Sequence, residues 1–162
     1  MSDPAVTLHM ICGKIAAGKS TLAAQLADAE NTVLIAEDAW LSALFGEQMQ
    51  TPADFVHYSA KLRNIMGPHV VALLNAGTSV VLDFQANTVE SRQWMQGILQ
   101  QTNAAHLLHV LVPPDAECLA RLHARNAAGT HPFTVTDEQF RQVSKYFAHP
   151  TPDEGFDLKI HS

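Results

Sequence analysis

The sequence predicts an α/β protein in which a parallel β-sheet is covered by helices on both faces. Two observations support this prediction. Short apolar runs alternate along the chain with segments of helical spacing, and a glycine-containing loop, residues 13–20, joins the first apolar run to the first helical segment. Strands buried on both faces appear as continuous apolar runs, which is typical of parallel sheets. The length of 162 residues predicts a single domain, 1–162, with a substantial core.

The predicted strands are short apolar runs that end at glycine, proline or polar residues. The first run ends at Gly13, the fourth is halted by two prolines, and the last is expected to be an edge strand. The five runs are residues 6–12, 32–36, 79–84, 105–112 and 156–160. Ligands of such sheets bind at the carboxyl ends of the strands. Residues that directly follow each strand are therefore the first candidates for a functional site.

The predicted helices begin at residues that cap helix N-termini. Thr51 precedes a proline at the first helical position, Thr136 and Gln139 have the spacing of a capping box, and Asn87 is expected to cap the helix after the third strand. The helical segments are residues 19–28, 39–45, 52–77 with a bend at 67–68, 87–101, a segment through Leu119 and Leu122, and 136–147. Residues 126–135 are predicted to form a loop.

Composition narrows the possible classes of protein. Hydrophobic residues make up 47% of the chain, which is typical of folded globular proteins. The net charge of −6 with only ten basic residues argues against a nucleic-acid partner. Two cysteines, the lack of a membrane-length apolar run and the lack of a signal sequence predict a cytoplasmic protein without a membrane partner. Its oligomeric state is left open between a monomer and a homodimer.

Residues 13–20, Gly-Lys-Ile-Ala-Ala-Gly-Lys-Ser, form a complete Walker A pattern between a predicted strand and a predicted helix. Gly13 and Gly18 permit backbone angles and a close approach that side chains would block. Successive backbone N–H groups, including those of Ala16 and Ala17, are expected to point inward and cradle phosphate oxygens. The loop therefore predicts nucleotide binding, whereas the alternative is a glycine turn with an incidental lysine.

Three side chains at the end of this loop have predicted roles toward ATP and Mg²⁺. Lys19 is expected to reach the β- and γ-phosphates, and the hydroxyl of Ser20 is expected to ligate magnesium. Thr21 is expected to support the α-phosphate side. These roles follow from the position of the residues at the N-terminus of a helix, where free amides and the helix dipole favour anions.

Three further patches follow the second, third and fourth predicted strands, in that order. They are Ala36-Glu37-Asp38-Ala39-Trp40, Val80-Val81-Leu82-Asp83 with Asn87 and Arg92 shortly after, and Arg121-Leu122-His123-Ala124-Arg125. With the loop, these patches make nearly the whole chain resemble P-loop kinases of the nucleoside-monophosphate-kinase-like group. The nearest types are chloramphenicol phosphotransferase, gluconate kinase, zeta toxin and the kinase half of polynucleotide kinase, and more broadly AAA-type ATPases. The resemblance implies a three-layer P-loop NTPase fold with a five-stranded parallel sheet, a Mg²⁺–ATP donor and a hydroxyl acceptor.

Asp38 occupies the position at which the resemblance implies a general base that accepts the proton of the acceptor hydroxyl. An ionised carboxylate within hydrogen-bond reach can orient the hydroxyl and take its proton. The alternative is a helix N-cap, and the two roles can coexist. Trp40 is either a wall of the acceptor pocket or a core residue. Zeta toxins and polynucleotide kinases carry an arginine where this chain has Leu41, so an uncharged small acceptor is favoured.

Asp83 ends a buried apolar strand, which is a Walker B-like arrangement. By the resemblance it would bind a magnesium-coordinated water across from Ser20, whereas the alternative is a turn residue at the end of a strand. Asn87 and Arg92 stand where the resemblance implies contacts with the acceptor. Their alternatives are a helix cap and a surface arginine.

Arg121 and Arg125 are four residues apart and therefore share one face of a helix. The resemblance implies that Arg121 packs on the adenine, whereas Arg125 enters a short lid around 126–135 and stabilises charge on the transferring phosphoryl group. Arginine suits both tasks, because it stacks flat on a ring and offers a planar fork to phosphate. The alternative is a pair of solvated helix arginines.

Together these patterns predict an ATP-dependent kinase that transfers the γ-phosphoryl group of Mg²⁺–ATP to a hydroxyl of a small molecule. A polynucleotide or nucleotide kinase is an alternative with the same chemistry. An ATP-binding regulatory protein without a dedicated acceptor is an alternative from another class.

Overall fold

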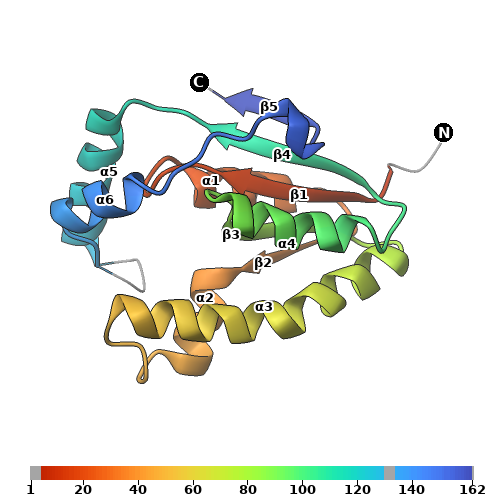
Figure 1. Ribbon diagram of the computed structural model, residues 1–162, viewed down its shortest axis with the longest axis horizontal. Coiled ribbons are helices and arrows are strands. Elements are labelled where there is room, and N and C mark those ends of the chain that lie inside the picture. Colours follow the sequence, from red (N-terminus) through yellow and green to blue (C-terminus); the bar gives the residue numbers. More distant parts are fainter. Residues whose placement is uncertain (1–4, 130–133, 162) are drawn as a thin grey trace.

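The computed structural model describes residues 5–129 and 134–161, and it places all five strands in one sheet (Figure 1). The strands are β1 (Thr7–Cys12), β2 (Thr32–Ala36), β3 (Ser79–Gln85), β4 (Ala105–Leu111) and β5 (Leu158–His161). Their order in the sheet is β2-β3-β1-β4-β5, and every neighbouring pair is parallel. The predicted five-stranded parallel sheet is confirmed, with β5 at one edge.

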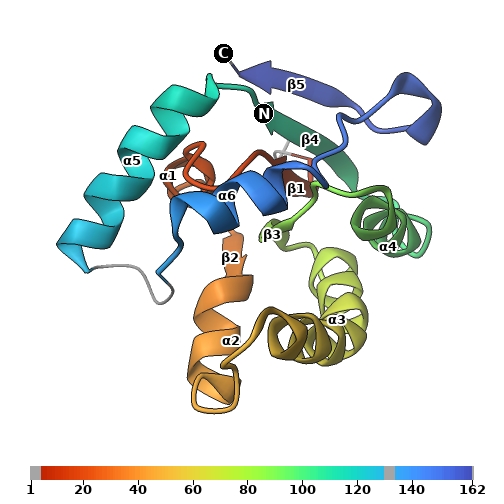
Figure 2. The same ribbon diagram turned by 60° about the vertical axis from the view of Figure 1, so that its left-hand side comes forward.

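Helices lie on both faces of this sheet and at one of its ends. They are α1 (Lys19–Ala27), α2 (Glu37–Phe45), α3 (Pro52–Asn75), α4 (Val89–Leu99), α5 (Asp115–Ala128), α6 (Asp137–Ser144) and the 3₁₀ turn η1 (Pro152–Glu154). Helices α3 and α4 cover one face and α1 the other, whereas α5 and α6 lie at the carboxyl ends of the strands (Figures 1 and 2). Among the described residues, no helix is both long and apolar enough to cross a membrane.

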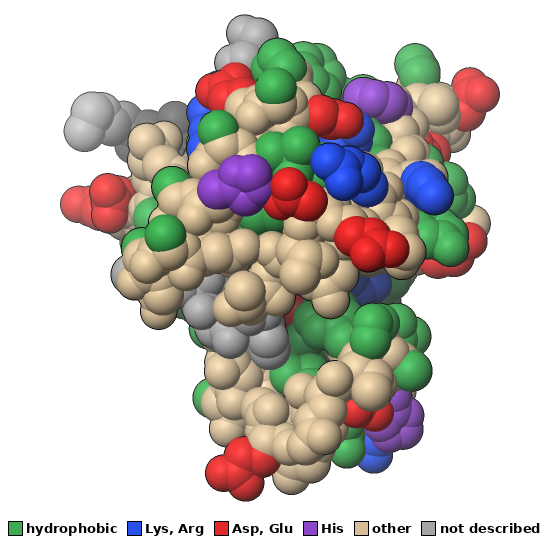
Figure 3. Space-filling model, turned by 90° about the vertical axis from the view of Figure 1, so that its left-hand side faces the viewer, with side chains coloured by type: hydrophobic (Ala, Val, Ile, Leu, Met, Phe, Trp, Pro, Cys, Tyr) green, Lys and Arg blue, Asp and Glu red, His purple; other side chains and the backbone are tan. Residues whose placement is uncertain are grey.

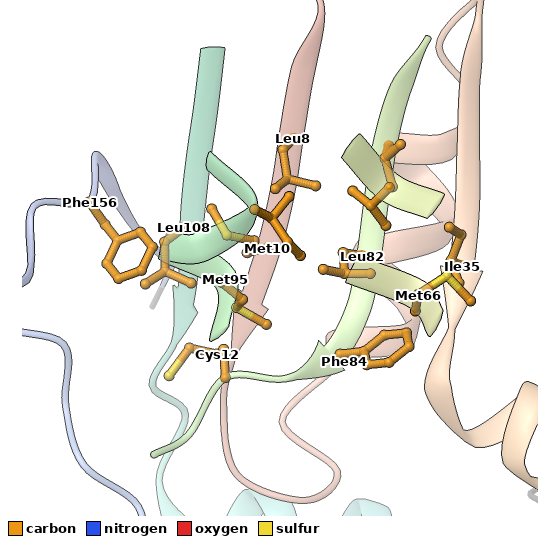
Figure 4. Close-up of a cluster of buried hydrophobic side chains, with 14 of the residues drawn as sticks. Leu8, Met10, Cys12, Ile35, Met66, Leu82, Phe84, Met95, Leu108 and Phe156 are labelled. Atoms are coloured by element: carbon orange, nitrogen blue, oxygen red, sulfur yellow. The ribbon is translucent and has the colours of Figure 1, made fainter. Parts of the chain in front are cut away.

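The core reflects the alternation of side chains along β1. Leu8, Met10 and Cys12 pack on the side of α3 and α4, among the buried apolar side chains shown in Figure 4. Ile11 points to the other side and packs with Ala23 of α1. Removing each of the larger side chains from water contributes about 1.5–3 kcal/mol. Burial on both faces is the reason why the strand sequences are apolar throughout.

Two of the predicted helix starts are confirmed as capping boxes. The Thr51 hydroxyl accepts a hydrogen bond from the Asp54 backbone N–H at 3.1 Å, and the Asp54 carboxylate accepts one from the Thr51 N–H at 3.2 Å. Thr136 and Gln139 make the same reciprocal pair at the start of α6. These starts could be predicted because both partners lie within one turn of each other in the sequence.

Three other local predictions are wrong. Helix α2 begins at Glu37 with Ala36 as its N-cap, so Asp38 is not a cap. Helix α4 is capped by Thr88, whose hydroxyl accepts from the Ser91 N–H at 3.2 Å, and not by Asn87. The loop expected at 126–135 begins later, because residues 126–128 complete the last turn of α5. Residues 130–133 of the expected lid lie outside the described residues.

Candidate active site

The loop between β1 and α1 has the backbone conformation of an anion cradle. Ala16 and Gly18 both adopt left-handed angles, with φ of 61° and 103°, and the Ala17 N–H donates to the Lys14 carbonyl at 3.0 Å. Alternation between left- and right-handed residues turns successive N–H groups toward one concave side. A Cβ on Gly13 would lie 3.2 Å from the Ala17 side chain, so the close packing of the loop also requires glycine there.

The N-terminus of α1 has no intrahelical partners for its first amides. Its N-cap is Gly18, which has no side chain to accept from them, and no acidic residue lies in the first turn. Ser20 and Thr21 follow directly and are exposed. Free amides together with the positive end of the helix dipole favour an anion at this position.

The Lys19 ammonium group lies within the loop. Its Nζ donates to the carbonyls of Gly13 at 2.6 Å and Lys14 at 2.9 Å. Burial lowers the pKa of Lys19, whereas the nearby carboxylates of Asp83 and Asp38 act in the opposite direction. The lysine is therefore close enough to both carboxylates to interact with them electrostatically.

Asp38 follows β2, whereas Asp83 lies within the neighbouring strand β3, two residues before its last residue Gln85 and not at its end as predicted. Ala36 at the end of β2 is in register with Asp83 of β3, and Asp38 comes two residues after Ala36. Both carboxylates are half-buried. The structure thus brings Lys19 and the two predicted acidic residues together at the carboxyl ends of the strands.

The two arginines of α5 also lie at the carboxyl ends of the strands, and they differ in their contacts. Arg121 donates from Nη1 to the Ala17 carbonyl of the loop at 3.1 Å and from Nη2 to Glu117 at 2.6 Å. Arg125 is half-buried, and its Nε has no hydrogen-bond partner among the described residues. Burial lowers the pKa of Arg125, and the charge of Asp38 opposes this effect. The alternative of a solvated arginine does not describe the half-buried Arg125, whereas Arg121 is exposed and also contacts the loop.

A cleft of about 630 Å³ opens beside the loop, between α1 and α5. Its volume is within the range of small-molecule sites. The residues that line it are Ala17, Gly18, Thr21, Leu22, Gln25, Leu111, Pro113, Glu117, Arg121 and His161. The cleft therefore places a space lined by both apolar and polar side chains next to the predicted phosphate cradle, with Arg121 on its wall.

Asn87 is hydrogen-bonded to the first residue of the loop. Its Oδ1 accepts from the Gly13 N–H and its Nδ2 donates to the Gly13 carbonyl, both at 2.8 Å. Each end of the side-chain amide thus makes one hydrogen bond to the loop, and its contact with an acceptor stays a prediction. This pairing could not be read from the sequence, because the two residues are 74 positions apart.

Arg92 is also in a different environment from the predicted one. Its side chain is 1% exposed, with Nε 2.7 Å from the Glu154 carboxylate. Its Nη1 donates to the carbonyls of Ala86 and Ala148, both at 2.8 Å. Arg92 is thus neither a surface arginine nor accessible to a dissolved acceptor, and it connects α4 with the C-terminal segment.

A buried ion pair that the sequence analysis missed lies next to Asp38. Glu37 is 3% exposed, accepts from the Ser59 hydroxyl at 2.7 Å and lies 3.5 Å from Arg63 Nε. Burial raises the pKa of Glu37, and Arg63 and Ser59 partly offset this rise. Arg63 also lies over the Trp94 ring, 5.1 Å from its centroid. A lone arginine in a long predicted helix carried no signal of these contacts.

Helix α2 also presents Trp40, which is 41% exposed, so the alternative that it is a core residue is wrong. Figure 3 views the molecule from the carboxyl ends of the strands. Charged side chains of both signs gather on the upper part, and the surface is hollowed above the lower part formed by α2 and α3. Leu41, on the same helix as Trp40, is fully buried.

A family model described as "AAA domain" matches residues 8–150. No curated protein sequence matches the chain at a significant level. Among solved structures, a provisionally assigned kinase from Chloroflexus aurantiacus has a TM-score of 0.76 at 20% identity, covering 99% of this chain and 86% of its own.

Two further structures have the same arrangement of elements. A component of the Pnkp1/Rnl/Hen1 RNA repair complex has a TM-score of 0.67 at 22% identity, over 90% of this chain and 45% of its own. A gluconokinase from Sinorhizobium meliloti 1021 has a TM-score of 0.60 at 14% identity, over 97% and 82%. At these identities the similarities establish the fold, and they confirm the predicted P-loop NTPase architecture.

Proposed function

This chain belongs to the AAA domain family, and on that premise we propose that it is an ATP-dependent kinase that phosphorylates a hydroxyl of a small molecule. One observation carries the proposal. Two cations, Lys19 and Arg125, and two carboxylates, Asp38 and Asp83, lie within electrostatic range of one another at the loop. Phosphoryl transfer needs cations around the transferred group and a carboxylate at the attacking hydroxyl.

On the donor side, the loop amides and the N-terminus of α1 hold the phosphates, and the cleft beside Arg121 holds the nucleoside. Lys19 Nζ exchanges its carbonyl partners for β- and γ-phosphate oxygens. The Ser20 hydroxyl and the Asp83 carboxylate are hard oxygen donors of the kind that magnesium prefers, and they would hold that ion. When bound, magnesium neutralises charge on the phosphate oxygens.

On the acceptor side, Asp38 orients the acceptor hydroxyl and receives its proton. A bond then forms between the acceptor oxygen and the γ-phosphorus, while the bond from that phosphorus to the bridging oxygen breaks and ADP leaves. Arg125 stabilises the negative charge on the transferring group. Trp40 lies two residues after Asp38 on α2 and supplies an apolar surface for the acceptor.

The test combines Mg²⁺–ATP with a panel of hydroxyl-bearing small molecules and detects products by phosphorus NMR and mass spectrometry. Asp38→Asn is expected to lower kcat by about 10²–10⁴-fold, because it removes the proton acceptor, with ATP affinity changed less than about twofold. Lys19→Ala is expected to weaken ATP binding and transfer together. Asp28→Asn, at the exposed end of α1, is the matched control. Transfer by Asp38→Asn at the wild-type rate would show that Asp38 is not the base.

A polynucleotide kinase is the second candidate, because the fold is shared with a component of an RNA repair complex. The net charge of −6 and the buried Leu41, which cannot reach an acceptor phosphate, argue against it. Transfer of labelled phosphate to the end of an oligonucleotide would favour it. Slow hydrolysis without any phosphorylated product, together with ATP-dependent binding of a protein, would instead favour a regulatory ATP-binding protein.

A further inference from the structure

Three histidines form a continuous hydrogen-bonded chain across β1, β4 and β5. His9 Nδ1 lies 3.0 Å from His109 Nε2, and His109 Nδ1 lies 3.0 Å from His161 Nε2. The rings stand on the α1 side of the sheet, because their neighbours Met10 and Leu108 point into the core on the other side. The three residues come from distant parts of the sequence and meet only in the folded sheet.

The central ring, His109, constrains the directions of the hydrogen bonds in this chain of three histidines. His109 is 1% exposed, and both of its ring nitrogens are hydrogen-bonded. Burial lowers the pKa of His109 to about 4, and the nearby His9, His161 and Lys159 act in the same direction, so this ring is neutral at physiological pH. A neutral imidazole has one N–H donor and one bare acceptor. The two hydrogen bonds must therefore run in the same direction.

This constraint allows two arrangements of the N–H groups in the histidine chain. When the N–H groups point toward β5, His161 Nε2 accepts and His161 Nδ1 carries a hydrogen, so this atom is a donor. When they point toward β1, His161 Nε2 donates and His161 Nδ1 is a bare acceptor, while His9 carries its hydrogen on Nε2. The tautomer of His9 and the hydrogen-bonding character of His161 are thus linked through His109.

His161 is one of the residues that line the 630 Å³ cleft beside the loop. Its Nδ1 makes no hydrogen bond to another of the described residues. Apolar side chains of Leu22 and Pro113 and the polar groups of Gln25 and Arg121 surround the same space. The lining therefore combines apolar side chains with hydrogen-bonding groups, which suits a heterocycle that has apolar faces and polar edge atoms.

We propose that His161 reads the purine base of the nucleotide in this cleft, and that His109 and His9 are positioning residues that set whether His161 Nδ1 donates or accepts. The inference rests on the proposed use of ATP. An adenine presents both an amino donor and bare ring nitrogens, so either arrangement of the chain has a partner on the base. The edge atom of the base that faces His161 in the bound orientation then selects one arrangement, and the selection extends to His9, which does not line the cleft.

The first experiment compares Mg²⁺–ATP with Mg²⁺–tripolyphosphate, which has the phosphates but no base, by isothermal titration calorimetry. His161→Phe is expected to weaken ATP binding by about three- to tenfold, the equivalent of one hydrogen bond, and to leave the Kd of tripolyphosphate within about twofold. His161→Gln, which keeps a hydrogen-bonding group, is expected to restore part of the loss. His106→Gln, on β4 but outside the chain, is the matched control.

The second measurement follows the imidazole nitrogens directly, in wild type and in His109→Leu. Long-range ¹H–¹⁵N NMR of the imidazole nitrogens is expected to show one tautomer at both His161 and His9 on saturation with ATP, but no such change with tripolyphosphate. In His109→Leu the response of His9 should disappear, whereas that of His161 should remain. A purely structural role of the chain would not produce a response to the base at His9.

The outcomes separate the inference from the proposed function. If wild-type protein binds neither ATP nor tripolyphosphate, the proposed function fails and this inference with it. If both bind and His161→Phe changes neither affinity, or weakens both equally, only the base-reading role is overturned. If ATP changes the nitrogens of His161 but not those of His9, the positioning role of His109 and His9 is overturned.

Discussion

At the scale of single residues, the phosphate loop depends on one side chain outside it. Asn87 makes two hydrogen bonds to Gly13, one to its N–H and one from its own amide to the Gly13 carbonyl. The same carbonyl accepts from Lys19 Nζ. Asn87 therefore fixes the peptide group whose carbonyl accepts from Lys19, and on the proposed function we expect it to affect nucleotide binding without touching the nucleotide.

Asn87→Ala is expected to weaken Mg²⁺–ATP binding by about tenfold, because both hydrogen bonds that hold the first residue of the loop are lost. Calorimetric titration measures this effect. Thr88→Ala is the matched control, since it removes the N-cap of α4 and costs about 1 kcal/mol of stability without changing a contact of the loop. Equal ATP affinities for Asn87→Ala and wild type would contradict the prediction.

His109 supports a prediction about pH. Its pKa is lowered to about 4 in the folded protein from 6.5, mainly by burial. Above pH 6.5 the ring is neutral in both states, and its full contribution to stability is present. As the pH falls toward 4, the unfolded chain binds the proton first, so the free energy of unfolding decreases by on the order of 3 kcal/mol. Urea unfolding at several pH values measures this loss.

His109→Gln keeps a polar side chain but cannot titrate in this range. The difference in unfolding free energy between wild type and this variant should therefore shrink as the pH falls from 7 to 4.5. Titrating groups that do not contact His109 contribute equally to both proteins and cancel in the difference. Parallel stability curves for the two proteins would show that His109 does not titrate in this way.

At the scale of elements, the sequence predicts best what neighbouring residues decide. The strands, the two capping boxes and the Walker loop depend on partners within a few positions, and all are found where they were expected. Asn87, Arg92 and the histidine chain were misread or missed, because their partners lie 50–100 residues away in the sequence. The packing of strands and loops in the folded protein brings such pairs together, and a single sequence does not show which residues meet.

The C-terminal segment is held to the rest of the fold by a few buried polar contacts. Arg92 of α4 binds Glu154 in η1 and the carbonyl of Ala148, and the Ala148 N–H donates to the Asn87 carbonyl at 2.8 Å. This segment leads from α6 to β5, so the same contacts also align the edge strand. The C-terminal segment is therefore connected to the loop through Asn87, which bonds to both Ala148 and Gly13.

Glu154→Ala is expected to destabilise the protein by about 3 kcal/mol, because it leaves the Arg92 guanidinium buried without its carboxylate. The double variant Arg92→Met, Glu154→Leu should recover most of this loss, because it removes both charges and keeps the volume. Chemical unfolding of wild type, Arg92→Met, Glu154→Leu and the double variant forms a double-mutant cycle, and Glu154→Ala is measured beside it. If the double variant were as unstable as the sum of the two single variants, the pair would not act as a unit.

At the scale of the whole molecule, the candidate site exists only in the folded chain. The loop follows β1, Asp38 lies at the start of α2 directly after β2, and Asp83 lies near the end of β3. Arg125 comes from α5 at the carboxyl ends of the strands. No segment of the chain contains all of these groups. Binding of ATP must therefore favour the folded state over the unfolded state, and its effect on stability measures how completely the site is assembled.

Mg²⁺–ATP at about 100 times its Kd is expected to raise the free energy of unfolding by about 2.7 kcal/mol, since the unfolded chain has no site for it. For a domain of this size the gain corresponds to an increase of roughly 5–10 °C in Tm. Thermal unfolding measured at a series of ATP concentrations should show a rise that is logarithmic in ligand. Lys19→Ala, at the same ATP concentrations, should lose most of the increase, because its phosphate contacts are missing. Asp38→Asn should keep the increase, because its carboxylate contributes to transfer and not to ATP binding. An equal increase in wild type and Lys19→Ala would mean that ATP binds elsewhere on the protein, and the assignment of residues 13–20 as the phosphate site would then be wrong.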